Sequence, residues 1–86
     1  MTTGQTIKKY MDEIGWSVID LHRLTLIPIS ALEAAIKGDY QLTLNQLMII
    51  VNKINLKQPE SKHWTTYHEI VLAPIMEGVN HDNQPK

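Results

Sequence analysis

Histidines are the residues in this sequence that could most directly support metal chemistry. His63, His68 and His81 lie in the last third of the chain. The helical zinc-peptidase motif places two histidines four residues apart with a glutamate after the first, and here His68 and Glu69 are followed by Leu72 at the position of the second histidine. The spacing therefore predicts surface histidines beside a helix and no bound metal.

A second set of reactive side chains lies near the N-terminus. Ser17, Asp20 and His22 supply the three residue types of a hydrolytic triad, but they fall within one short segment. Ser17 with Asp20 is explained by a helix cap, in which each side chain bonds a backbone N–H group. The chain has no cysteine and no glycine-rich phosphate loop. We therefore expect no enzyme activity and no cofactor.

The composition favours one small folded domain. The chain has 86 residues, of which 43% are hydrophobic and 20% charged, and its net charge is −1. The longest apolar stretches, 47–51 and 70–76, are much shorter than the roughly 20 residues of a membrane helix. The first residues do not resemble a secretion signal. These features predict a cytoplasmic protein that does not bind membranes.

Hydrophobic periodicity and cap signals predict four short helices in the first two thirds of the chain. The first is about 4–14, before Gly15, and the second about 18–24, with Ser17 as its cap. The third begins at Pro28 or two residues later and ends at Lys37 and Gly38. The fourth is about 44–54, after a Thr43 cap, and turns Leu47, Ile50, Val51 and Ile54 to the core.

The last third of the chain predicts one more helix. Pro59 closes a linker, and the apolar spacing from Trp64 to Met76 indicates a fifth helix, which Pro74 should kink or end. We divide the chain into a domain at 1–56, a linker and C-terminal helical appendage at 57–79, and a flexible polar tail at 80–86.

The first 56 residues resemble the lambda-repressor-like, or XRE-type, helix-turn-helix DNA-binding domain. The family spacing is kept without a gap over about residues 5–56, which is two thirds of the chain. The residues that carry this resemblance are Ile7-Lys8-Lys9-Tyr10, Gly15-Trp16-Ser17, Leu21, Leu24-Thr25, Ile27, Ser30, Leu32, Gly38, Leu44, Leu47, Ile50 and Ile54.

The resemblance implies an all-α bundle of four short helices plus a C-terminal helix, with the third helix in the major groove of double-stranded DNA. The implied function is that of a small transcriptional regulator acting as a dimer. Base-facing residues would be Pro28, Ile29, Ser30, Glu33 and Ala34. Phosphate contacts would come from Ser17, Val18, Lys37, Tyr40, Gln41 and Thr43.

Several residues depart from the family pattern. The groove-facing set lacks the Arg, Lys, Asn and Gln side chains that make bidentate contacts to bases, Leu26 replaces the usual turn glycine, and His22 replaces a small residue. Apolar residues also occupy positions that are usually polar and solvent-facing: Ile19, Ile29, Ile36, Leu42 and Ile49. A second hypothesis is therefore a degenerate helix-turn-helix protein that binds a protein partner, as an antirepressor or inhibitor; the alternative for the apolar set is that some members belong to the core.

The fifth helix predicts an interface. The first four helices already supply the apolar layer of the family fold, so we expect the apolar residues after Pro59 to bind a second copy or another partner. Removing 60–86 should then leave a folded monomer. The interface residues would be Trp64, Tyr67, Ile70, Val71 and Met76.

Overall fold

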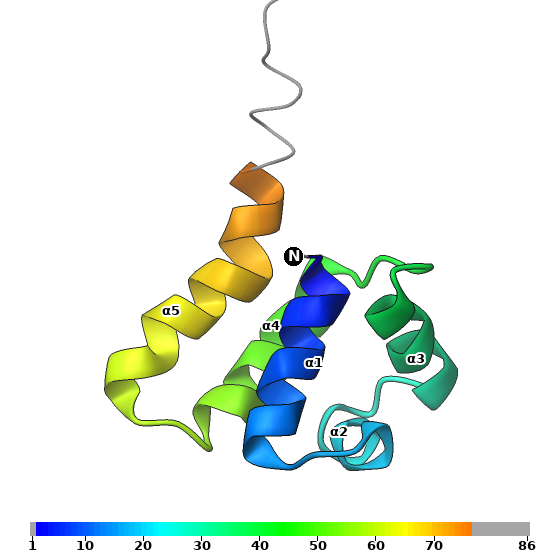
Figure 1. The fold of residues 1–86 in the computed structure, drawn as a ribbon, viewed down its shortest axis with the longest axis horizontal. Coiled ribbons are helices and arrows are strands. Elements are labelled where there is room, and N and C mark those ends of the chain that lie inside the picture. The colour runs from blue at the N-terminus through cyan, green and yellow to red at the C-terminus, as the bar shows by residue number, and fades with distance from the viewer. Residues whose placement is uncertain (1, 77–86) are drawn as a thin grey trace, which may run out of the picture.

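Residues 2–76 of the chain are described by a computed structural model, and in this range every regular element is helical (Figure 1). The first four helices are α1 (Thr3–Ile14), α2 (Val18–Thr25), α3 (Ile29–Lys37) and α4 (Leu44–Asn55). A C-terminal helix at 60–76 consists of a 3-10 turn (Glu60–Lys62), α5 (His63–Tyr67), a π-helical turn (His68–Leu72) and a last helical turn at 73–76. The all-α prediction is confirmed for this part of the chain, and the predicted tail at 80–86 lies outside the described residues.

Local capping signals define the helix ends. Thr2, Ser17 and Thr43 each begin a helix with a reciprocal cap. The side chain of the cap residue accepts a hydrogen bond from the backbone N–H three residues later, and the side chain of that later residue accepts one from the backbone N–H of the cap residue. Gly15 and Gly38 end α1 and α3 with φ of 91° and 89°, which is the left-handed region that glycine enters without a steric cost. The predicted boundaries of α1, α2 and α4 are confirmed to within one residue, and Pro28 is the cap of α3.

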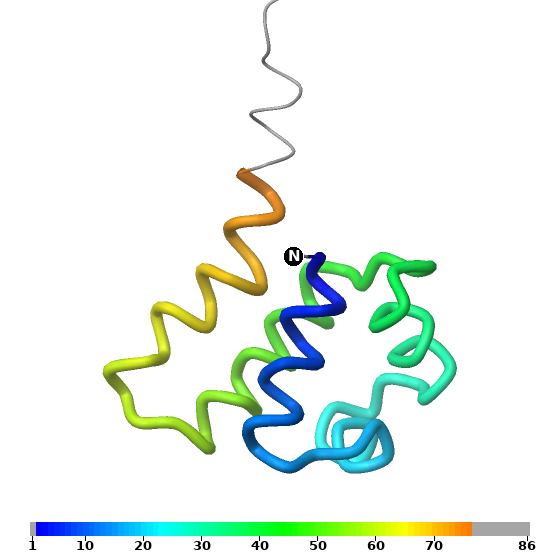
Figure 2. The backbone as a smooth tube through the Cα atoms, in the orientation of Figure 1, coloured from blue at the N-terminus to red at the C-terminus, as the bar shows by residue number. Residues whose placement is uncertain are grey.

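The helices enclose one hydrophobic core. In Figure 1, α1 lies in the middle, with the C-terminal helix on one side and α2 and α3 on the other, while α4 lies behind it. Figure 2 follows the chain through the same order. The most deeply buried side chains come from all of these elements: Ile7, Met11, Leu21, Leu32, Ile50, Ile54, Ile70 and Val71.

The C-terminal helix completes this core. Ile70 and Val71 are 0% and 1% exposed, and the helix packs on both α1 and α4. The Tyr10 hydroxyl on α1 donates a hydrogen bond of 2.5 Å to Glu69 Oε1. The prediction that Ile70 and Val71 face a partner is therefore wrong: α1 and α4 leave an apolar side that these residues cover.

A close approach of two backbones joins α1 to α3. A Cβ atom added to Gly4 would lie 2.0 Å from the carbonyl oxygen of Ala35, far inside van der Waals contact. Glycine is a poor helix former, so its presence inside α1 is explained by this contact rather than by helix propensity. The contact determines how closely α3 approaches the rest of the bundle.

Pro74 does not end the C-terminal helix, which continues to residue 76. The chain instead widens into a π-helical turn just before the proline, where the Ala73 N–H bonds the carbonyl of His68, five residues earlier. In a regular α-helix the proline ring would clash with the carbonyl four residues before it. The wider turn provides room for the ring and lets the helix continue.

Candidate functional site

The turn between α2 and α3 is held by side chains of α2. Leu26 has φ of 62°, the one positive value among the described non-glycine residues, and its side chain is 80% exposed. The Thr25 hydroxyl donates to the Leu21 carbonyl and accepts from the Ile27 N–H. His22 Nδ1 lies 2.7 Å from the Ile27 carbonyl oxygen, and because that oxygen can only accept, the ring nitrogen donates. His22 thus makes a bond that stabilises the turn.

The outer side of α3 is accessible. Of the predicted base-facing residues, Pro28, Ile29, Ser30 and Glu33 are exposed and Ala34 is half-buried. The opposite side of α3 is anchored in the core by buried residues, including Leu32. Pro28 makes no side-chain cap, and the first turn holds no acidic residue. The first backbone N–H groups of α3 therefore have no side-chain acceptor.

The predicted phosphate contacts differ in what they can offer. The Ser17 N–H and hydroxyl both contact Asp20 Oδ2, at 2.9 and 3.1 Å. The hydrogen bond from the Ser17 backbone is the main cause that lowers the pKa of Asp20 below its usual value, so a carboxylate lies at the start of α2, near Val18, where a phosphate would bind. The Thr43 N–H donates to Gln46 Oε1. These groups are already used within the chain.

The remaining predicted phosphate contacts are Lys37, Tyr40 and Gln41, all exposed at the end of α3 and in the following loop. From Ser17 to Thr43 the sequence has two cations, Arg23 and Lys37, and three acidic residues, which leaves this unit with a net charge of −1 when histidine is neutral. Since phosphate neutralisation supplies much of DNA affinity, this unit can support only weak binding.

Apolar side chains surround the α2–α3 turn. Leu24, Leu26 and Ile29, which we call the turn patch, are all exposed. Among the residues predicted to be unusually apolar, Ile19, Ile29 and Ile49 are exposed, Ile36 is half-buried against the core, and Leu42 is buried. The prediction of an exposed apolar set is thus wrong for Leu42, because the loop after α3 turns that side chain into the core.

The predicted partner interface is divided by the fold. Trp64 is 64% exposed and Met76 is 51% exposed, whereas Tyr67 packs partly against the core. The Trp64 ring lies 5.7 Å from the Tyr67 ring and 6.2 Å from the His68 ring, between centroids. Trp64 and Met76 therefore remain available to a partner, at opposite ends of the C-terminal helix.

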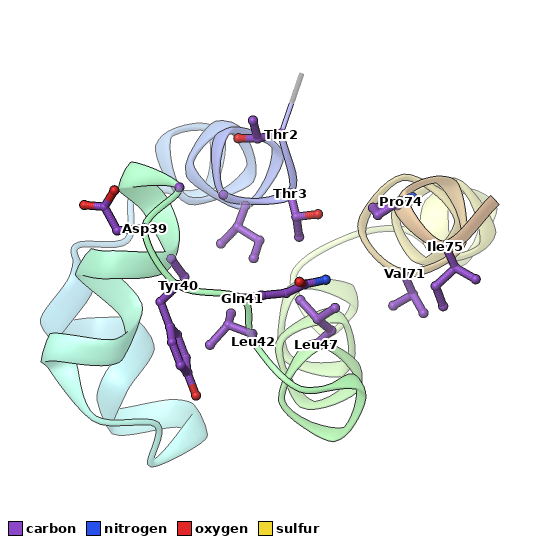
Figure 3. A pocket seen from close by; sticks show the side chains of 14 residues that line it. Thr2, Thr3, Asp39, Tyr40, Gln41, Leu42, Leu47, Val71, Pro74 and Ile75 are labelled. Carbon is purple, nitrogen blue, oxygen red and sulfur yellow. The ribbon is translucent and has the colours of Figure 1, made fainter. Parts of the chain in front are cut away.

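A groove of about 460 Å³ opens beside the end of the C-terminal helix (Figure 3). Its walls come from five parts of the chain: the start of α1, Ala35 on α3, the loop after α3, Leu47 on α4, and the C-terminal helix at Val71, Pro74 and Ile75. In Figure 3 the Gln41 amide extends into the space between these walls, whereas the Asp39 carboxylate points away. Leu47 thus borders this groove and is half-buried, although periodicity placed it in the core. The sequence carries no signal for a groove assembled from segments so far apart.

The histidines and the possible triad have structural contacts. His63 Nε2 lies 3.1 Å from the Gln58 carbonyl oxygen, and within residues 2–76 no three His, Asp or Glu side chains are grouped so that they could hold a metal ion. His81 lies outside the described residues. Ser17 and Asp20 form the α2 cap, and His22 bonds the turn. In the same range, no helix combines the length and apolar character needed to cross a membrane.

Comparisons with known proteins identify no relative: no family model, no curated protein and no solved structure matches this chain.

Proposed function

We propose that this chain is a small DNA-binding regulator of the lambda-repressor-like helix-turn-helix type, in which α3 enters the major groove. The observation that carries the proposal is the exposed start of α3. It has no side-chain cap and no acidic residue in its first turn, whereas α1, α2 and α4 each begin with a reciprocal cap. Unbonded N–H groups at a helix start favour phosphate oxygens. The family spacing over 5–56 supports the same use of α3.

Binding in this mode is weak and only moderately dependent on salt. Lys37, the last residue of α3, is the one cation within this helix, and Asp39 lies two residues after it. With about two to four phosphates neutralised per subunit, log affinity should change with log salt by roughly −0.9 for each phosphate. A transcription factor with this surface would discriminate bases through Ser30 and Glu33 and through apolar contact with thymine methyl groups.

A salt titration on mixed-sequence duplex DNA tests the proposal. Lys37→Glu should lower affinity about tenfold at low salt on every sequence, because a phosphate contact carries no base information. Lys57→Glu is the matched control, since Lys57 is also exposed but lies in the connection after α4. Equal losses in the two variants, or no binding by the wild-type chain at low salt, would contradict DNA binding through α3.

Asp20→Asn gives a second test with opposite effects on stability and binding. The lowered pKa of Asp20 means that its carboxylate stabilises the folded state above the ordinary pKa of about 4, and that this stability is lost as the pH falls through the lowered value. The variant should therefore be less stable near pH 7. Its DNA affinity should rise a few-fold at low salt, roughly as expected from removing one repelling charge. Lower affinity would show that the start of α2 does not face phosphate.

The turn patch favours a second function, in which the same scaffold binds a protein partner as an antirepressor or inhibitor. Leu26 keeps a large apolar side chain on the surface in a backbone conformation that glycine adopts more easily. Leu26→Gly removes that side chain and adds no charge. Binding of a protein by the wild-type chain and by Lys37→Glu, but not by Leu26→Gly, would support the partner-binding function. Unchanged DNA binding by Leu26→Gly, with no protein bound by the wild-type chain, would support the DNA-binding function.

A further inference from the structure

The exposed face of α3 presents three different chemical groups in a fixed order. In Figure 1, α3 lies at the outer edge of the bundle. Ile29 is 37% exposed and Ser30 and Glu33 are exposed, whereas Leu32 and Ala35 are buried. Successive residues of a helix are about 100° apart around its axis, so Glu33 lies between the other two exposed side chains, about 40° from Ile29 and about 60° from Ser30. The order across the helix is therefore an apolar group, a carboxylate and a hydroxyl.

The Glu33 carboxylate has no ion-pair partner within residues 2–76. The one ion pair in this range joins Lys8 and Asp12 on α1, so Lys37, one turn further along α3, does not occupy Glu33. Long side chains of a helix lean toward its N-terminus, which brings the carboxylate back toward the level of Ile29. An ionised carboxylate accepts hydrogen bonds and donates none, so it favours donors and repels acceptors.

This order of groups can be compared with the edges of base pairs in the major groove. Thymine presents a methyl group beside the O4 acceptor, and adenine presents the N6 donor with the acceptors N7 and thymine O4 on either side. Cytosine presents the N4 donor, followed by the O6 and N7 acceptors of guanine. Thymine therefore repels Glu33, adenine places an acceptor against Ile29, and unmodified cytosine offers Ile29 no methyl group. A methyl group on C5 of cytosine completes the series of methyl group, donor and acceptor.

We propose that α3 binds DNA that contains 5-methylcytosine. Ile29 contacts the C5 methyl group, the Glu33 carboxylate accepts a hydrogen bond from N4, and the Ser30 hydroxyl donates one to guanine O6. This preference rests on the proposed function, because it requires α3 to lie in the major groove. One methyl group in an apolar contact should give about a fourfold preference for methylated over unmodified DNA for each helix bound.

A competition between DNA libraries measures this preference without a known operator. Randomised duplexes are copied with either cytosine or 5-methylcytosine, mixed in equal amounts and incubated with the full chain at low salt, and the bound duplexes are counted by sequencing. The methylated library should be enriched about fourfold, with cytosine at a fixed position of the enriched sequences. A library copied with N4-methylcytosine should not be enriched, because its methyl group replaces the N4 hydrogen that faces the major groove.

Substitutions on α3 separate the two contacts. Ile29→Ala should still select cytosine through Glu33 but should lose the preference for the methyl group, and Ile29→Ser provides a second variant if Ile29→Ala lowers the melting temperature. Glu33→Gln should shift the enriched base toward adenine, because a glutamine amide accepts from N6 and donates to N7. Glu13→Gln removes the same charge from an exposed position of α1 and is the matched control, which should keep the wild-type enrichment.

Four results would overturn the proposal. Equal or lower recovery of the methylated library shows that α3 does not bind the methyl group, while DNA binding itself still stands. Recovery of no library at low salt contradicts the methyl preference and the proposed function together. A methyl preference that persists in both Ile29 variants shows that another residue contacts the methyl group. An unchanged enriched base in Glu33→Gln shows that Glu33 does not face that base.

Discussion

The α2–α3 unit and the C-terminal helix both keep apolar side chains on the surface, but they differ in the chemistry around them. In the α2–α3 unit the turn patch lies in a segment with three acidic residues and two cations, and Leu26 holds a left-handed backbone conformation. The C-terminal helix at 60–76 has three charged residues: Glu60 and Lys62 lie in its first turn, and Glu69 bonds Tyr10 on α1. Exposure alone is therefore not enough to assign a surface. The charges beside it indicate whether it faces a charged partner or an uncharged one.

The largest expected effect comes from removing the C-terminal helix. Deleting 60–86 uncovers the core where Ile70 and Val71 lie, and burial of each such side chain contributes about 1.5–3 kcal/mol. Together with the loss of the Tyr10–Glu69 bond, this is a large share of the roughly 5–15 kcal/mol that stabilises a small domain. We expect no cooperative thermal transition by circular dichroism. Deleting only 77–86 is the control and should preserve the cooperative transition. A cooperative melt of the 1–59 chain would show that the C-terminal helix is an appendage and not part of the core.

Gly4→Ala tests the contact between α1 and α3 that holds the α2–α3 unit against the rest of the bundle. The new methyl group cannot fit 2.0 Å from a backbone oxygen, so α1 and α3 must move apart. We expect a loss of about 1–3 kcal/mol in the free energy of unfolding, as for overpacked cores, measured by urea denaturation. Glu13→Ala changes an exposed position of the same helix and should remain within about 0.5 kcal/mol of wild type. An unchanged or higher stability of Gly4→Ala would mean that the two helices are not in contact there.

Tyr10→Phe removes the polar link between α1 and the C-terminal helix. The lost hydrogen bond should cost about 1 kcal/mol near pH 7, measured by urea denaturation. Burial is the main cause that raises the pKa of Tyr10, with the Glu69 hydrogen bond second. A group with a raised pKa contributes its stability below its unfolded-state pKa of about 10, and that stability is lost as the pH rises through the folded-state value. The difference between wild type and Tyr10→Phe should thus shrink above pH 10; a difference that grew there would contradict the assignment.

The smallest effect is expected at the turn itself. Leu26→Gly relieves the cost of a left-handed conformation, about 1–2 kcal/mol, but increases the entropy of the unfolded chain, so the net gain should be about 0.5–1 kcal/mol. Leu56→Gly is a matched control, since Leu56 is equally exposed but has helical dihedral angles. It should be neutral or destabilising. If both substitutions change the melting temperature alike, Leu26 is not strained.

The fold could be predicted from the sequence where the signals are local. The caps at Ser17 and Thr43 and the glycines at 15 and 38 involve residues a few positions apart, so their roles can be read without knowing the tertiary structure. Periodicity also identified an apolar face after Pro59. It cannot show what covers that face, and for this reason the sequence predicts a partner contact for Ile70 and Val71, which the structure packs on α1 and α4.

The candidate site was predictable only in part, for the same reason. The exposure of Pro28, Ser30 and Glu33 follows from the placement of the two helices, and the Ser17–Asp20 cap is a local signal, but the burial of Leu42 depends on how the loop after α3 turns. The groove brings together residues more than 60 positions apart, from Thr3 to Ile75. No pattern of adjacent residues reports such a juxtaposition.

The π-helical turn before Pro74 determines the direction of the chain's end. A π turn contains about one residue more than an α-helical turn, so every residue after Leu72 is rotated by roughly 100° relative to an uninterrupted α-helix. Deleting one residue within 68–72 would remove the extra residue of the π turn and rotate Ile75 and Met76 to another side, and it would also bring the Pro74 ring against the carbonyl four residues before it. The number of residues in this short segment therefore sets the direction of the helix end at 73–76. A one-residue change in that number would redirect the helix end even though residues 73–76 themselves stayed the same.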